Sequence, residues 1–270
     1  MARRLSGIPV LMYHGIAALG VGVDVRDRKY WVAASSFRQQ LEQLRHTGRR
    51  TVGLASHWGS QRAGGGANDV VLTFDDGRTS DYEVAFPLLL EMGARAEFFV
   101  NTGTIGEPGH LTWMQIAEMQ RAGMSFQSHA HDHVALLPLT RDMVQWQLRT
   151  SKQLLEDHLG RAVEFFAAPY GLLGRHVLEA AFESGYAAVC NSRHWPAHVG
   201  GRVVNRVAVH GDTSVTQFAG LLECELGAYL PGFSLMAAKE LPKRMLLRLR
   251  PGALGVSLAG RRAYADGGRA

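Results

Sequence analysis

A regular alternation of short apolar runs with helical patterns is the feature that most constrains how this chain can fold. Apolar strands that alternate with helices are typical of a parallel β-sheet covered by helices. An open doubly wound sheet and a (β/α) barrel both fit this order of elements. The predicted strands are residues 9–13, 69–74, 96–100, 124–127, 163–167 and 187–189.

Helical patterns fill most of the stretches between the predicted strands. Ser36 and Thr112 are predicted to cap the amino ends of two of them. Four of the patterns end in a glycine, where helices favour a residue with a left-handed backbone. The predicted helices are residues 36–48, 81–93, 112–123, 141–159 and 175–185.

Polar and reactive side chains directly follow five of the predicted strands. In both candidate folds the carboxyl ends of the strands meet at one rim, and active sites lie there. We therefore expect these side chains to share one site. They are His14, Asp75, Asp76, Asn101, His129, His133, Pro169 and Tyr170.

Residues 73–77 read Thr-Phe-Asp-Asp-Gly and place two carboxylates side by side. Because side chains alternate along a strand, the two aspartates cannot face the same way. If the chain turns at Gly77, one carboxylate can bind a metal ion while the other faces a substrate. The alternative is structural, a helix N-cap with a turn aspartate.

Residues 128–133 read Ser-His-Ala-His-Asp-His. His129 and His133 are four residues apart, so a helical turn would place both rings on one face. With Asp76 they would supply two imidazoles and a carboxylate, the ligand pattern of a catalytic zinc site. His131 should point away from that face and is predicted to lie outside the ligand set.

The other side chains of this rim offer the groups that a metal-activated water needs. Asp75 could accept a proton from the water. The backbone N–H of Tyr170, which follows Pro169, is a candidate donor to a developing oxyanion. His14 could protonate a leaving amine, and the alternative is a buried histidine at a strand end.

At these residues the sequence resembles the polysaccharide deacetylases of the NodB-homology type, carbohydrate esterase family 4. The resemblance covers residues 8–215 and rests on three motifs in order, TFDDG at 73–77, SHAHDHVAL at 128–136 and FAAPYG at 166–171. It implies a distorted (β/α) barrel with its active site at the carboxyl ends of the strands. It also implies roles for the site residues: Asp75 as the base, Asp76, His129 and His133 as metal ligands, and the backbone at Pro169 and Tyr170 as the lining of the oxyanion site.

Two departures from the family pattern matter. The family carries an arginine three residues before the tyrosine of the third motif, where this chain has Ala167, so Asp75 is expected to lack its usual cationic neighbour. The late Leu-x-His motif is also unclear. Both features resemble the circularly permuted branch that acts on poly-β-1,6-N-acetylglucosamine and related exopolysaccharides. That branch opens with a strand ending in Tyr-His, which makes His14 the general acid, with His210 as the alternative.

The resemblance implies a metal-dependent hydrolase that removes N-acetyl groups from amino sugars in a poly- or oligosaccharide, releasing acetate and a free amine. The cofactor would be one divalent metal ion, zinc before cobalt or nickel. Three alternatives stay open: a deacetylase or deformylase of a small or lipid-linked amino-sugar precursor, another C–N amide hydrolase on this fold, and a non-catalytic carbohydrate-binding relative. The candidate substrate contacts are Asn101, Pro169, Trp113 and Trp195, with the tryptophans as platforms for a sugar ring.

The basic charge of the chain is concentrated at its carboxyl end. Residues 231–270 hold eight lysines and arginines against two acidic residues, a net charge of +6. Because the whole chain has a net charge of +5, the other 230 residues have a net charge of −1. We therefore expect a near-neutral deacetylase domain at 1–230 and a basic tail at 231–270. Residues 239–250 alternate basic and apolar side chains as a helix on a membrane surface does, and a helix packed on the barrel is the alternative.

Composition excludes several other classes of protein. The chain lacks the aromatic–basic interleaving of single-strand binders, so no nucleic-acid partner is expected despite the basic balance. Two cysteines are too few for a disulfide framework. The apolar runs are too short to cross a bilayer, and the amino end shows no signal-peptide cleavage site. The expected location is the cytoplasm, or the inner face of the membrane if the tail binds lipid.

Overall fold

The main sheet of the protein is built from parallel strands. The computed structural model describes residues 3–18, 28–58 and 65–234, and every structural statement below concerns these residues. The strands of the main sheet are β1 (Val10–Tyr13), β4 (Arg50–Thr51), β5 (Asp69–Asp76), β6 (Glu97–Val100), β7 (Ser125–Ser128), β8 (Phe165–Ala167), β9 (Ala188–Cys190), β10 (Val203–Val204) and β11 (Val207–Ala208). Their order is β10-β9-β8-β7-β6-β5-β1-β11, and β4 pairs with β5 outside this path.

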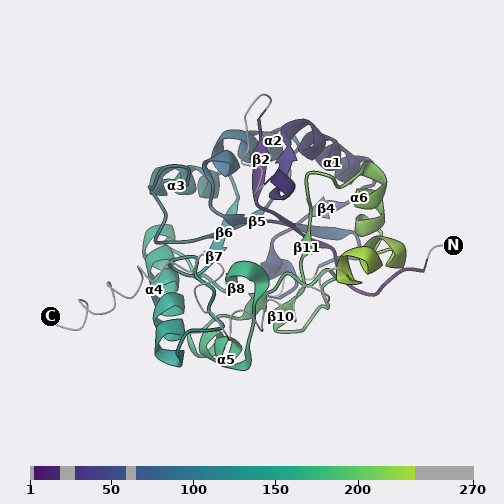
Figure 1. Ribbon diagram of the computed structural model, residues 1–270. Helices are drawn as coiled ribbons and strands as arrows, with labels where there is room; N and C mark the ends of the chain where they lie inside the picture. The colour runs from purple at the N-terminus through teal and green to yellow at the C-terminus, as the bar shows by residue number, and fades with distance from the viewer. Residues whose placement is uncertain (1–2, 19–27, 59–64, 235–270) are drawn as a thin grey trace.

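The sheet curls back on itself. Its two edge strands, β10 and β11, are separated in sequence only by Asn205 and Arg206. Residues 203–208, here called the closing segment, therefore run from one edge of the sheet to the other. The fold is the distorted (β/α) barrel that the sequence predicts, with its helices arranged around the strands (Figure 1).

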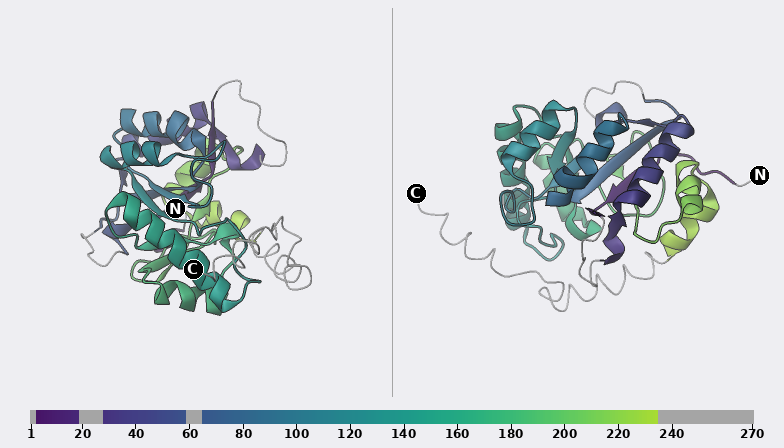
Figure 2. Two further views of the ribbon diagram at one scale, coloured as in Figure 1. Left: turned by 90° about the vertical axis from the view of Figure 1, so that its left-hand side faces the viewer. Right: turned by 90° about the horizontal axis from the view of Figure 1, so that it is seen from above.

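The helices lie on both sides of the strands, as the left view of Figure 2 shows. The predicted helix at 81–93 begins as a π-helix, η3 (Asp81–Ala85), before it continues as α2. A second, two-stranded parallel sheet joins β2 (Gly15–Ala17) to β3 (Trp31–Ala33). The labelled α-helices are α1 (Ala34–His46), α2 (Phe86–Glu91), α3 (Trp113–Arg121), α4 (Arg141–Leu159), α5 (Arg175–Glu183) and α6 (Val215–Leu222), and the 3₁₀-helices are η1 (Arg28–Tyr30), η2 (Leu54–Ser56) and η4 (Pro169–Gly171). A further helical stretch covers residues 226–234.

Of the two predicted N-cap residues, Thr112 was right and Ser36 was wrong. Thr112 caps α3 through a capping box with Gln115. The prediction for Ser36 was wrong, because α1 already begins at Ala34 and its N-cap, Ala33, offers no side-chain hydrogen bond. The glycines predicted to end four helices all have a left-handed backbone: Gly48, Gly93, Gly123 and Gly185.

The polarity of the side chains that face the barrel interior changes along β5. Leu72 and Phe74 pack against the helices outside the sheet, whereas Val71 belongs to an apolar cluster inside the barrel. Because side chains alternate along a strand, Thr73 and Asp75 face the same interior as Val71. Along β5 the interior therefore passes from the apolar Val71 to the hydroxyl of Thr73 and the carboxylate of Asp75 near the carboxyl end.

Within the described residues, no helix is both long enough and apolar enough to span a membrane. Most of the predicted basic tail, from residue 235 onward, lies outside the described residues. The predicted surface helix at 239–250 falls in that part of the chain. At the start of the predicted tail, Phe233 packs edge-on against Trp195, with their ring centroids 5.3 Å apart.

Candidate active site

The carboxyl ends of the strands border a pocket of about 580 Å³. This is the rim where the alternation of strands and reactive residues predicts a site. Six of the predicted residues line the pocket, and so does the alternative general acid. They are His14, Asp75, Asp76, His129, His133 and Tyr170, together with His210.

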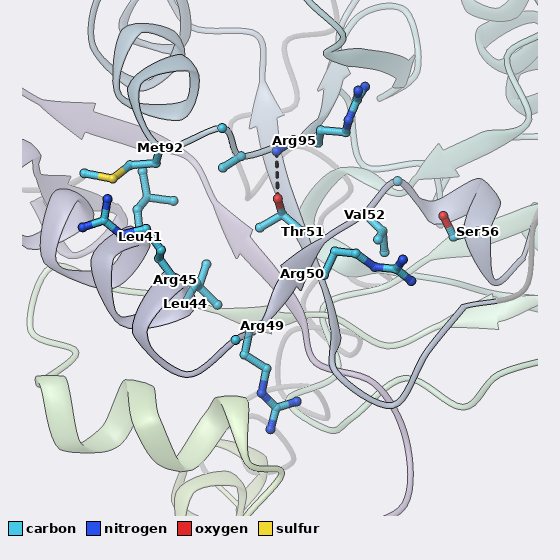
Figure 3. Close-up of a pocket in the computed structure, with 14 residues that line it drawn as sticks. Leu41, Leu44, Arg45, Arg49, Arg50, Thr51, Val52, Ser56, Met92 and Arg95 are labelled. Atoms are coloured by element: carbon cyan, nitrogen blue, oxygen red, sulfur yellow. Dashed lines mark hydrogen bonds between the residues drawn. The ribbon is translucent and has the colours of Figure 1, made fainter.

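A second cavity of about 650 Å³ lies beside β4 and the loop that precedes β6 (Figure 3). No histidine, cysteine or carboxylate lines it. Arg49 pairs with Glu223 and Arg50 pairs with Asp69. Figure 3 shows these arginines pointing away from each other. The groups needed for hydrolysis therefore gather in the first pocket.

Asp76, His129 and His133 form a cluster that fits a metal ion. One donor atom from each residue lies within 4.8 Å of the other two. Asp76 Oδ1 is 3.6 Å from His129 Nε2 and 3.2 Å from His133 Nε2. Ligand atoms about 2.1 Å from a tetrahedral zinc ion lie about 3.4 Å from one another, so the spacing suits such an ion.

The hydrogen bonding of this cluster also favours a bound cation. His129 Nδ1 donates to the carbonyl oxygen of Ala167 at 2.8 Å, and burial lowers the pKa of His129 to about 4. The neutral ring therefore turns the lone pair of Nε2 toward Asp76 Oδ1, a buried oxygen with no hydrogen-bond donor. Two buried lone pairs facing each other are unfavourable unless a positive ion lies between them.

The loop between the two histidines is not the helical turn that their spacing suggested. Residues 129–133 form no helix. Ala130 and His133 have left-handed backbones, with φ of 66° and 51°. The loop nevertheless brings the rings of His129 and His133 to a centroid distance of 5.2 Å. His131 lies outside the cluster, as predicted, and contacts Thr102 Oγ1 through Nδ1 at 2.8 Å.

A tight turn at the end of β5 separates the two aspartates. The strand extends through both of them, two residues further than predicted. Asp76 and Gly77 both have positive φ, 81° and 64°. A Cβ on Gly77 would lie 2.9 Å from the side chain of Val100, so only glycine fits there. Arg78 Nη2 donates to Asp76 Oδ2 at 3.0 Å, which leaves Oδ1 to face the histidines.

Asp75 does have a cationic neighbour, and the expectation that it would lack one was wrong. Arg206, in the closing segment, donates to Asp75 Oδ1 at 2.6 Å and to Oδ2 at 2.7 Å. Both side chains are almost fully buried. Burial opposes the ionisation of Asp75, but the charge and the hydrogen bonds of Arg206, together with the nearby histidines, outweigh it and hold the pKa of Asp75 below its usual value.

His14 and His210 flank the same aromatic ring. The ring of Tyr30 lies 5.0 Å from that of His14 and 5.8 Å from that of His210, between ring centroids. Burial lowers the pKa of both histidines. The electrostatic neighbours of His14 include Asp75 and Asp76, whereas those of His210 include Lys29 and Asp212.

The turn after β8 exposes the backbone and the ring of Tyr170 to the pocket. Tyr170 has a left-handed backbone with φ of 60°, and its ring centroid is 5.0 Å from that of His133. Pro169 opens the turn and is buried beneath it. Pro169 shapes this turn and is not among the residues that line the pocket.

Three further predicted substrate contacts lie away from the pocket. Asn101 is buried, and its amide nitrogen donates to the carbonyl of His129, so it supports the loop from below. Trp113 stacks on His158, with 3.7 Å between ring centroids. Trp195 packs against Tyr229 and Phe233. None of these three described residues lines the pocket.

Sequence reasoning missed two arginines of the site. Arg78 follows the TFDDG motif directly, so its position gave a local signal. Arg206 is 131 positions from Asp75 in the sequence, and no local pattern connects the two. The available hint was a polar pair, Asn205 and Arg206, in front of an apolar run that ends in a histidine.

Comparisons with known proteins agree with this geometry. The family model for polysaccharide deacetylases matches residues 63–189. The chain is 32% identical over 181 residues to YxkH of Bacillus subtilis, a candidate polysaccharide deacetylase, and the match covers 66% of this chain and 62% of that protein. It is 24% identical over 173 residues to poly-β-1,6-N-acetyl-D-glucosamine N-deacetylase of Staphylococcus aureus, with 58% of this chain and 60% of that protein covered. The chain thus spans about three fifths of the length of these two relatives.

A solved structure matches more completely. The Streptococcus pyogenes deacetylase PplD, solved in complex with acetate, superposes with a TM-score of 0.74 at 27% sequence identity. The superposition covers 81% of this chain and 99% of that one.

Proposed function

We propose that this chain is a polysaccharide deacetylase of the NodB-homology type, a metal-dependent hydrolase that removes N-acetyl groups from amino sugars in a poly- or oligosaccharide. The observation that carries the proposal is the Asp76–His129–His133 cluster, which lies in one pocket with the ion-paired Asp75. Its products would be acetate and a free amino group on the sugar. The likeness to the staphylococcal deacetylase favours a β-1,6-linked substrate.

The three residues of the cluster would hold one divalent ion, zinc before cobalt or nickel. A carboxylate and two imidazoles suit zinc, and a three-residue set leaves a position open for water or substrate. When bound, the ion polarises the acetamide carbonyl and makes a bound water more acidic. The hydrogen bond from His129 to Ala167 fixes the ring so that Nε2 faces Asp76 Oδ1 and would be free to bind the ion.

Asp75 would act as the general base. Arg206 keeps the carboxylate ionised and fixes its orientation, so Asp75 is ready to accept a proton at neutral pH. Each of its oxygens has a second lone pair that the guanidinium does not use. A proton taken up there stays in a buried pocket lined by the other reacting groups.

Two groups on the other sides of the pocket would complete the reaction. The backbone N–H of Tyr170 would donate to the oxyanion that forms when the acetamide carbon becomes tetrahedral. His14 would protonate the departing amine. Its electrostatic coupling to Asp75 and Asp76 supports His14 over His210, because the acid must reach the nitrogen next to the same carbon.

Acetate release from defined sugars tests the proposed function. The zinc-loaded chain should release acetate from β-1,6-linked N-acetylglucosamine oligomers faster than from acetylated chitooligosaccharides or from nucleotide- and lipid-linked amino sugars. Metal removal by a chelator should abolish release, and added zinc should restore it. His129→Ala should lose both the zinc and the activity, because two ligands hold the ion poorly. Acetate release that persists without metal, or no release from any of these sugars, would refute the proposal.

Paired variants separate the two candidate general acids. We expect His14→Ala to lower kcat on an N-acetylated sugar by about 10²- to 10⁴-fold, and His210→Ala to lower it far less. Both variants should still hydrolyse 4-nitrophenyl acetate, because its leaving group needs no proton. A larger loss in His210→Ala than in His14→Ala would transfer the role to His210.

A further inference from the structure

The loop that carries the two histidine ligands is held by hydrogen bonds from two sides. On one side, the loop after β6 donates hydrogen bonds to two carbonyl oxygens of the histidine loop. The Asn101 amide donates to His129 O, and Gly103 N donates to His131 O at 2.9 Å. On the other side, the N–H groups of His131 and Asp132 point toward α4. These partners on two sides hold a loop that contains left-handed residues.

Both of those N–H groups donate hydrogen bonds to the same side-chain oxygen. His131 N and Asp132 N donate to Gln147 Oε1 at 3.0 and 2.9 Å. The amide nitrogen of the same Gln147 donates to Asp132 Oδ2 at 2.6 Å. The side chain of Gln147 is 4% exposed. Gln147 is thus a buried amide that uses its acceptor and its donor on the same two loop residues.

A second contact from the same face of α4 supports this arrangement. Ser151 lies one helical turn after Gln147, and its Oγ is 2.9 Å from Ser128 Oγ, at the start of the loop. Ser128 Oγ also accepts a hydrogen bond from Ala130 N at 3.2 Å. Two positions of α4 therefore hold the loop that carries the ligands, although neither touches a ligand side chain.

We propose that Gln147 is a positioning residue that sets the metal affinity of this protein by holding the loop between His129 and His133. The inference rests on the proposed function, because it takes those two histidines as ligands. Without the amide, two buried N–H groups would lose their acceptor. The loop would then relax away from its left-handed residues, and the histidines would spend less time in the geometry that binds an ion.

Zinc affinity of the full chain, measured by competition with a chromophoric chelator, tests the inference without any sugar. Gln147→Met keeps the size and neutrality of the side chain and removes both hydrogen-bonding groups. We expect it to raise the Kd for zinc about tenfold, as losses in the outer shell of metal sites do. The control is Gln145→Met on the same helix, whose amide donates to the exposed Glu183, and its Kd should match the wild type.

A charge-conserving exchange provides the rescue. In Gln147→Glu with Asp132→Asn, the new carboxylate can accept from both backbone N–H groups and from the new amide, so the network is restored with the same net charge. We expect a zinc Kd within about threefold of the wild type. If Gln147→Met does not fold, Gln147→Asn, which withdraws the amide by one methylene group, should show the same weakening.

The outcomes distinguish this inference from the proposed function. An unchanged zinc Kd in a folded Gln147→Met or Gln147→Asn variant would overturn it, and so would an exchange variant as weak as Gln147→Met. A wild type that binds no zinc would overturn both ideas. A wild type that binds zinc but deacetylates no sugar would refute the proposed function alone, and the affinity comparison would still stand.

Discussion

Asp75→Asn should keep its bound zinc and lose about 10³-fold in kcat, within the range expected for the loss of a general base. The amide has nearly the same shape as the carboxylate but cannot accept the proton of the attacking water. The proposed metal ligands, Asp76, His129 and His133, are untouched by the change. The measurements are acetate release under saturating substrate and the zinc content of the purified variant.

The matched control for this variant is Asp69→Asn. Asp69 is also a buried aspartate that pairs with an arginine, Arg50, and it lies at the opposite end of β5. Both substitutions weaken an ion pair, so both should lower stability. Only Asp75→Asn should abolish turnover. Turnover of Asp75→Asn within tenfold of the wild type would show that another group is the base.

Arg206→Met should destabilise the fold by about 3–5 kcal/mol, the usual consequence of leaving one member of a buried ion pair without its partner. Methionine fills much of the space of the arginine stem, so the cost comes from the carboxylate of Asp75. Its two oxygens would lose the donors at 2.6 and 2.7 Å. The free energy of unfolding from denaturant titration measures the effect, and activity should fall as well.

The double variant Asp75→Leu with Arg206→Met separates charge from packing. Replacing both members of a buried pair by apolar groups often costs little stability. The double variant should therefore recover most of the stability lost in Arg206→Met and remain inactive, because it has no base. A double variant as unstable as Arg206→Met would mean that packing, and not the unpaired charge, causes the loss.

The pH dependence of the free energy of unfolding gives a second test of the Asp75–Arg206 ion pair. In the wild type, Arg206 holds the pKa of Asp75 low, so the pair stabilises the fold above pH about 4 and this contribution is lost as the pH falls through the lowered pKa. In Arg206→Met, burial alone should raise the pKa of Asp75, so stability should fall as the pH rises. The difference between the two proteins should be largest at neutral pH and shrink toward pH 4.

The sequence predicted the site well where local pattern and topology act together. His14, Asp76 and His129 each follow an apolar strand, and parallel strands in one sheet bring their carboxyl ends to one rim. That rule needs no knowledge of side-chain contacts. It explains why the pocket could be expected before the fold was known.

The features that the sequence did not display depend on contacts between distant segments. The spacing of His129 and His133 suggested a helix, but the backbone of the loop is set by Gln147 and by the loop after β6. The position of Trp113 was inferred from its nearness in sequence to the rim, yet the ring stacks on His158 of α4. Long-range hydrogen bonds and ring packing decide such positions, and a single sequence does not display them.

The closing segment couples the closure of the barrel to the charge state of Asp75, the proposed base. The same six residues join the two edges of the sheet and deliver the guanidinium that keeps Asp75 ionised. Local unfolding of the closing segment would separate the two edges of the sheet and at the same time remove the Arg206 guanidinium from Asp75. Turnover should therefore report on barrel closure, and denaturant should abolish it in step with the loss of β10 and β11 pairing, not before it.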